Sequence, residues 1–319
     1  WVLLQPRDYI NGLQLFIGLI LLYGATLLLA PEISAPAFNS NTPEGTPSMV
    51  PLLFVTIACG AISGFHGLVA SGTTSKQLDK ETDARFVGYL GAVGEGVLAL
   101  ISIIAVITLF PDRAAFSASY SSFADASGAG LGNFIEGATV LASGLMIPGS
   151  VASTIVSIIV VSFAATTLDT SVRLMRYIIS ELGVEYNVPQ LEKKHVATSI
   201  AVLSSMALVI LPEGPNGFGS GGYLLWPLFG TSNQLLAGIS LLLISIWLRK
   251  LGRNYMITII PMVFLMFMTL WAMFQQVFLQ WAWYNEGSNT LLFVFGAIIF
   301  VFTLWIILTA AQALMSKSN

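Results

Sequence analysis

The residues best suited to binding chemistry lie in an apolar run at 50–74, where glycines surround Ser63 and His66. Four glycines weaken a helix there: Gly60, Gly64, Gly67 and Gly72. A helix that breaks in this run leaves backbone N–H and carbonyl groups unpaired, and the start of its second half attracts anions. We therefore predict that this segment binds the carboxylate of a substrate through five residues: Gly60, Ser63, Gly64, Phe65 and His66.

A packing role for the same residues is the alternative. In that interpretation, the pair Gly60-xxx-Gly64 lets another helix approach closely, and His66 forms a hydrogen bond across the contact.

A second polar cluster lies at 166–173, at the end of another apolar run. Hard cations such as Na⁺ take oxygen ligands, and a carboxylate at membrane depth can also carry a proton. We predict an ion- or proton-coupling site at Thr166, Thr167, Asp169 and Thr170. The alternative is an ion pair between Asp169 and Arg173, four residues apart on a helix.

Three further groups of polar residues lie in or beside apolar runs. Glu95, between Gly94 and Gly96, is interpreted either as a proton carrier or as a buried hydrogen-bonding partner. Asn233 and Gln234 either bridge helices, which is the commoner role, or face a cavity. His195 follows two lysines at the expected start of a helix, which indicates an interfacial position.

Two motifs fail because of their context. The run Gly217–Gly222 resembles a nucleotide-binding loop, but it follows an apolar span and not a β-strand. The run Ala61–Gly64 nearly matches the Gly-x-Ser-Gly of rhomboid intramembrane proteases, but it lacks the leading glycine. No later apolar run supplies a buried histidine as general base, so a serine hydrolase is disfavoured.

The composition defines the class of protein that must position these groups. Charged residues make up 9% of the 319, whereas soluble domains carry roughly 25%. Hydrophobic residues make up 55%, and the mean hydropathy is +0.82. The net charge of −3 gives no basic field for nucleic acid, and the single cysteine, Cys59, excludes a disulfide framework and a cysteine-ligated zinc site. These values predict an all-α, polytopic membrane protein.

About eight runs are long enough to span a bilayer, which requires about 20 apolar residues each. They are 13–30, 50–74, 86–110, 149–176, 194–212, 223–248, 254–282 and 288–315. A shorter segment, 134–145, is predicted to be a re-entrant or interfacial helix in the same transmembrane domain. With both termini placed in the cytoplasm, 12 of the 13 lysines and arginines lie inside and Arg113 alone lies outside, as the positive-inside rule requires.

The beginning of the chain reads as a juxtamembrane connection to a preceding helix. Trp1 is not an initiator methionine, and no signal peptide pattern follows it. We expect an upstream first repeat in a longer chain.

Several stretches together resemble the carbon starvation protein A (CstA) family. They are 4–9 (LQPRDY), 57–66 (IACGAISGFH), 71–74 (SGTT) and 225–230 (LWPLFG) with Asn233 and Gln234. The resemblance runs from residue 1 to about residue 250. It implies an inner-membrane protein linked to peptide uptake under starvation, with relatives that import pyruvate with protons.

The resemblance also implies a LeuT-like fold of the amino acid–polyamine–organocation superfamily, built from two inverted repeats of five helices. The discontinuous span 50–74 then becomes the sixth helix of that fold and 149–176 the eighth, where related carriers place Thr and Ser ligands. The family's upstream helices are not in this chain, and Thr231-Ser232 stands where many members are more apolar.

The leading hypothesis is therefore a secondary active transporter of peptides or small carboxylates such as pyruvate, driven by H⁺ or Na⁺. No enzymatic activity, cofactor, metal site or nucleic-acid partner is expected, and a homo-oligomer is compatible with the pattern. The alternative is a membrane sensor or scaffold that binds a nutrient without moving it. Sequence alone decides neither the substrate nor the coupling ion.

Overall fold

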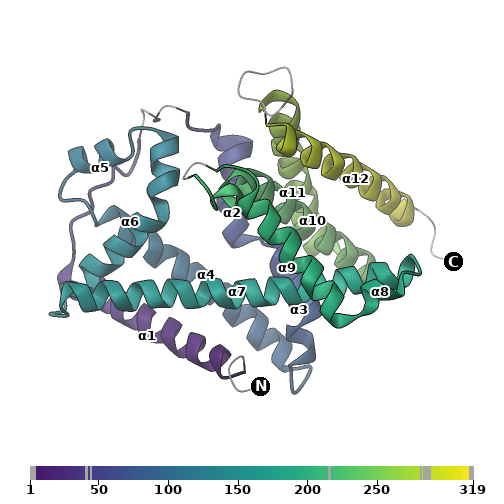
Figure 1. Cartoon of the computed structure of the whole chain (residues 1–319), viewed down its shortest axis with the longest axis horizontal. Coiled ribbons are helices and arrows are strands. Elements are labelled where there is room, and N and C mark those ends of the chain that lie inside the picture. The colour runs from purple at the N-terminus through teal and green to yellow at the C-terminus, as the bar shows by residue number, and fades with distance from the viewer. Residues whose placement is uncertain are drawn as a thin grey trace. The chain divides into compact units, whose positions relative to one another are not determined.

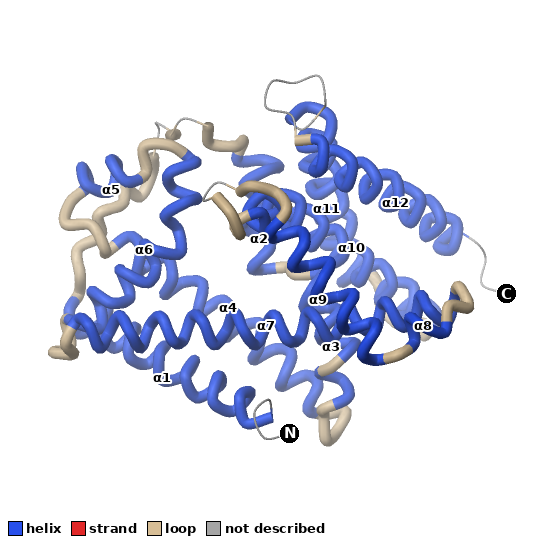
Figure 2. The backbone as a smooth tube through the Cα atoms, viewed as in Figure 1, coloured by secondary structure: helices blue, strands red, loops and turns tan. Residues whose placement is uncertain are grey.

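The computed structural model describes residues 5–39, 42–43, 45–214, 217–280, 282 and 289–315. These residues form helices joined by loops, and the described ranges contain no β-strand (Figure 2). The chain divides into two units, 1–46 with 85–173 and 47–84 with 174–319.

Six helices are long and apolar enough to cross a membrane within the described part of the chain. They are α1 (Gln5–Leu29), α4 (Asp83–Ile107), α7 (Gly149–Glu185), α10 (Trp226–Lys250), α11 (Met256–Phe274) with its continuation η4 (Gln275–Gln280), and α12 (Thr290–Met315). Large apolar side chains such as Val301, Trp305 and Leu308 are exposed, as expected of helices that face lipid. The chain is a multi-pass helical membrane protein.

Two of the eight predicted spans take a different form. The run 194–212 corresponds to α9 (Lys194–Ile210), which is shorter than the other spans. The run 50–74 is divided into a π-helical turn η1 (Met49–Leu53), α2 (Phe54–Ala61) and α3 (Gly64–Gly72). The interruption at 62–63 falls within the span predicted to be discontinuous. The count of eight crossings and the LeuT-like fold stay predictions, as does the predicted start of the last span at 288, which lies outside the described residues.

The first unit contains α1, α4, α5 (Arg113–Ser119), α6 (Phe123–Ser143) and most of α7 (Figure 1). Its core joins Leu22 of α1, Ile101 of α4, Leu141 of α6 and Val156 of α7. Gly137 of α6 lies against the backbone of Ala105, so only a residue without a side chain fits this crossing.

Helix α6 begins at Phe123, earlier than the predicted segment 134–145. Ser122 explains the difference, because its hydroxyl accepts a hydrogen bond from the Asp125 amide at 3.1 Å and caps the helix. The carboxylate of Asp125 in turn accepts hydrogen bonds from Ser121 and Ser122. This cap offsets the low helix propensity of the glycines that follow. The re-entrant character of 134–145 stays a prediction.

The second unit is built on the antiparallel pair α10 and α11, with α2, α3 and α12 packed against it. The label of α12 marks the yellow helix in Figure 1. Short helical segments complete the unit: η2 (Thr74–Lys76), α8 (Pro189–Glu192) and η3 (Gly221–Leu225). Buried residues such as Leu235, Leu242 and Met262 form the contact between α10 and α11.

Half-helix α3 lies unusually close to α10. A Cβ atom built on Gly64 would lie 2.5 Å from the backbone nitrogen of Ala237, and one built on Gly67 would lie 3.1 Å from the Ser240 hydroxyl. Glycine at position 64 is therefore required for the backbones of α3 and α10 to approach each other.

Replacing Gly64 with alanine is expected to push α3 away from α10 and to lower the stability of the second unit by about 1–3 kcal/mol. Thermal unfolding of the purified protein in detergent measures the effect. Gly230→Ala is the matched control, since a Cβ at Gly230 of α10 meets nothing within 4 Å. Equal melting temperatures for the two variants would contradict the packing.

Candidate functional site

The break between α2 and α3 is held by the side chain of Asn233 on α10. Its Oδ1 accepts a hydrogen bond from the backbone N–H of Phe65 at 2.7 Å, and its Nδ2 donates to the Ser63 hydroxyl at 3.1 Å. Ser63, in extended backbone conformation, also accepts from the His66 N–H at 3.4 Å as the N-cap of α3. Two N–H groups at the start of the half-helix are therefore occupied by neutral oxygen atoms.

Gln234, the neighbour of Asn233, binds the other half of the broken helix. Its Nε2 donates to the backbone carbonyl of Val55 in the first turn of α2 at 3.0 Å. The side chain of Gln234 is completely buried. Asn233 and Gln234 thus bridge helices, the commoner of the two roles considered from the sequence.

His66 lies on the opposite face of α3 from this contact. Two residues along a helix correspond to a rotation of about 200°, so the face that presents Gly64 to α10 turns His66 away from it. Gly64 is buried and His66 is exposed. The close approach predicted for Gly64 is therefore observed on one face of α3, and a binding role for His66 on the other face stays a prediction. Gly60 lies in the last turn of α2, where carbonyl groups lack partners within the helix.

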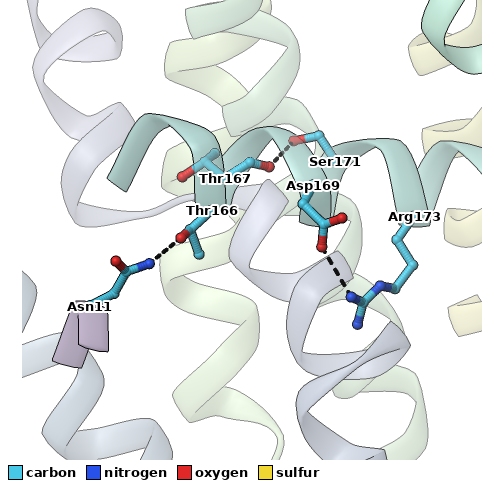
Figure 3. Close-up of polar contacts among 6 residues, drawn as sticks. All are labelled: Asn11, Thr166, Thr167, Asp169, Ser171 and Arg173. Atoms are coloured by element: carbon cyan, nitrogen blue, oxygen red, sulfur yellow. Dashed lines mark hydrogen bonds and ion pairs between the residues drawn. The ribbon is translucent and has the colours of Figure 1, made fainter. Parts of the chain in front are cut away.

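A seam of polar contacts joins α1 to α7 in the first unit. Asn11 donates to the hydroxyl of Thr166, and the Ser162 hydroxyl donates to Gln14 Oε1 at 2.7 Å (Figure 3 shows the Asn11 contact). One turn further along, Gly18 faces Ile159. These contacts hold Thr166 against α1. Asn11 and Gln14 were not identified from the sequence as partners of α7. Their spacing of three residues places them on one face of a helix, which is the signal that could have indicated this role.

The other predicted coupling residues have partners on α7 itself. The Thr167 hydroxyl donates to the carbonyl of Phe163 at 3.0 Å. Asp169 Oδ2 accepts from Arg173 at 3.0 Å, and both side chains are about one-third exposed, at 31% and 34%. Figure 3 shows Thr166 directed toward Asn11 and Asp169 toward Arg173, so these side chains do not converge on one point.

Two predicted residues remain. Thr170 lies in the same stretch of α7, and Glu95 is half-buried on α4. A Cβ at Gly91, Gly94 or Gly96 would meet nothing within 4 Å, so the glycines beside Glu95 contact no other element in the described part of the first unit. No group of three His, Cys, Asp or Glu side chains suited to a metal occurs among the described residues.

Apolar helices that pack through small residues, together with a broken helix fixed by buried amides, define a polytopic helical membrane protein. The family model for the carbon starvation protein CstA matches residues 1–128 and 113–272. The chain belongs to this family.

Curated relatives agree with this assignment. The chain is 32% identical over 321 residues to the peptide transporter CstA of Helicobacter pylori strain 26695, which covers 85% of this chain and 46% of the relative. It is 31% identical to the peptide transporter CstA of Campylobacter jejuni, over 91% of this chain and 47% of that protein. It is 29% identical to the pyruvate/proton symporter BtsT of Escherichia coli K12, over 87% and 48% respectively. The chain thus spans about half the length of these relatives, and no solved structure matches it.

Replacing Asn233 with alanine is expected to free the Phe65 N–H and destabilise the start of α3 by about 1 kcal/mol. Hydrogen–deuterium exchange measures this as faster exchange at the amides of Phe65 and His66. Ser232→Ala is the control, because its hydroxyl bonds only within α10, to Phe229. Unchanged exchange in Asn233→Ala would contradict the capping role.

Proposed function

We propose that this chain is part of a secondary active transporter that imports peptides or small carboxylates such as pyruvate. The observation that carries the proposal is the broken helix α2–α3, whose two halves are held on α10 by Asn233 and Gln234. Broken helices at membrane depth are typical of transporters, in which they line substrate and ion sites. The names of the relatives, peptide transporter and pyruvate/proton symporter, support the two substrate classes.

The substrate carboxylate binds at the start of α3 in this proposal. The positive end of the half-helix dipole lies there, and the N–H of Phe65 is held by a neutral amide oxygen. A carboxylate makes stronger, charge-assisted hydrogen bonds than an amide and can replace it. His66 approaches the ligand from the face of α3 that is turned away from α10. Gly64 does not contact the substrate in this proposal, and its lack of a side chain lets α3 lie close to α10. Gly60 lies in the last turn of the other half-helix, α2.

Coupling in this proposal uses the proton that Asp169 can accept. Thr166 and Thr167 already have hydrogen-bond partners, and Asp169 forms an ion pair with Arg173, which protonation of the carboxylate would release. Glu95 on α4 is the second candidate proton carrier. Na⁺ coupling through the threonine hydroxyls and Thr170 is the competing mechanism.

The distribution of lysines and arginines supports an inner-membrane orientation with both termini in the cytoplasm. The direct test of transport is uptake of labelled pyruvate or dipeptide by proteoliposomes that contain the protein expressed from its native locus. Saturable binding without uptake would overturn the transporter and leave a nutrient sensor.

Replacing His66 with alanine is expected to raise the KM for uptake about tenfold, since a hydrogen bond to a charged group is lost. His195→Ala is the control, because His195 lies in the first turn of α9 and outside the proposed site. A KM within about twofold of the unmodified protein would contradict the role of His66.

Replacing Asp169 with asparagine is expected to abolish proton-driven accumulation while downhill exchange of substrate continues. Arg173→Gln breaks the same ion pair but keeps the carboxylate, so it should retain accumulation. Accumulation measured with an imposed pH gradient distinguishes the two variants. If both lose accumulation equally, the pair has a structural role and the coupling assignment is wrong.

A further inference from the structure

Buried oxygen atoms without a hydrogen-bond partner gather in one part of the second unit. Among the described residues, they are Gln234 Oε1, Thr269 Oγ1, Gln275 Oε1 and Gln276 Oε1. They lie on α10, α11 and η4. Gln234 and Thr269 are both completely buried. A buried acceptor without a donor raises the free energy of the folded protein. We therefore expect a bound molecule to donate hydrogen bonds to some of these atoms.

The register between α10 and α11 places Gln234 opposite Thr269. The hydroxyls of Ser245 and Thr258 lie 2.8 Å apart, Gly238 packs on the Met266 sulfur, and Gln276 Nε2 donates to the Pro227 carbonyl at 3.5 Å. These three contacts define an antiparallel register: as the residue number falls along α10, the number of the residue opposite it rises along α11 and η4. Continuing that register from Gly238 by one turn brings the side chain of Gln234 to the level of Thr269.

Helix α2 is the third helix that packs beside Gln234 and Thr269. The Nε2 of Gln234 is fixed by the Val55 carbonyl, which leaves its Oε1 as an acceptor only. Val55 packs with Ala272, and Ala272 lies one turn from Thr269 on the same helix. Leu265, Met266 and Met273 are buried residues within one turn of Thr269 on α11.

The chemistry of the site selects a neutral ligand. From 226 to 248 and along α11, the sequence contains no charged side chain, and a bare cation needs about six oxygen ligands. A water molecule needs two to four polar partners and can donate to both Gln234 Oε1 and Thr269 Oγ1. We propose that Gln234 and Thr269 bind an internal water molecule at the junction of α2, α10 and α11. This inference is independent of the transport assignment.

Hydroxyl-radical labelling by a brief X-ray pulse tests the proposal, because radicals formed from bound water oxidise methionines beside it. The full chain in nanodiscs is the sample. Met266 and Met273 flank Thr269 and are 7% and 0% exposed, so bulk solvent does not account for their labelling. Met262, which is also buried but lies one turn farther from Thr269, is the internal reference.

We expect rapid oxidation of Met266 and Met273 and a decrease of about fivefold in Thr269→Val, with Met262 unchanged. Thr269→Ser keeps the hydroxyl and should label like the unmodified protein. Thr303→Val removes another buried threonine hydroxyl, which bonds within α12, and should have no effect on these methionines. Thermal unfolding confirms that each variant is folded.

Three results would overturn the proposal. Protection of Met273 in the unmodified protein would mean that Gln234 and Thr269 bond directly to each other. Equal labelling in Thr269→Val would place the water elsewhere. A loss of labelling when NaCl replaces choline chloride would identify a cation and not water as the ligand.

Discussion

The requirement that every backbone polar group inside a bilayer have a partner constrains the whole structure. Unbroken helices meet it internally, but the interruption between α2 and α3 does not. Asn233 meets it at the start of the second half-helix, whereas Gln234 binds a carbonyl in the first turn of α2, away from the interruption. Because both belong to α10, this one helix binds both halves of the broken segment, and Gly64 lets α3 lie close enough to α10 for the Asn233 bonds to form.

Hydroxyl groups follow the same constraint in a second way. Many Ser and Thr side chains on the long helices donate to the carbonyl four residues earlier, as Thr167 and Thr303 do. Among the described residues, Ser63, Thr166 and Ser245 instead have a partner on another helix. A cluster of hydroxyls in an apolar sequence therefore overstates the number of oxygen atoms available to an ion, which explains why the run at 166–170 does not form one converging site.

The sequence predicted the helical membrane class, the family and the position of the break, because these follow from apolar length, glycine spacing and specific motifs. It also predicted the Asp169–Arg173 pair as an alternative and helix bridging by Asn233 and Gln234. It did not predict their partners, Val55 and the Phe65 amide, since the register between separate helices leaves no local pattern. Helix α6 begins before the segment predicted at 134–145, because Ser122 caps a helix that starts in a glycine-rich stretch.

The length of α7 has a consequence for Asp169. The helix has 37 residues, so it extends about 55 Å, whereas the hydrocarbon core is about 30 Å thick. Residues 149–168 carry no charge and match that thickness, so the remaining part of α7 continues into the aqueous phase. In the coupling that we propose, Asp169 would then stand at the water boundary, where its carboxylate needs no internal proton relay.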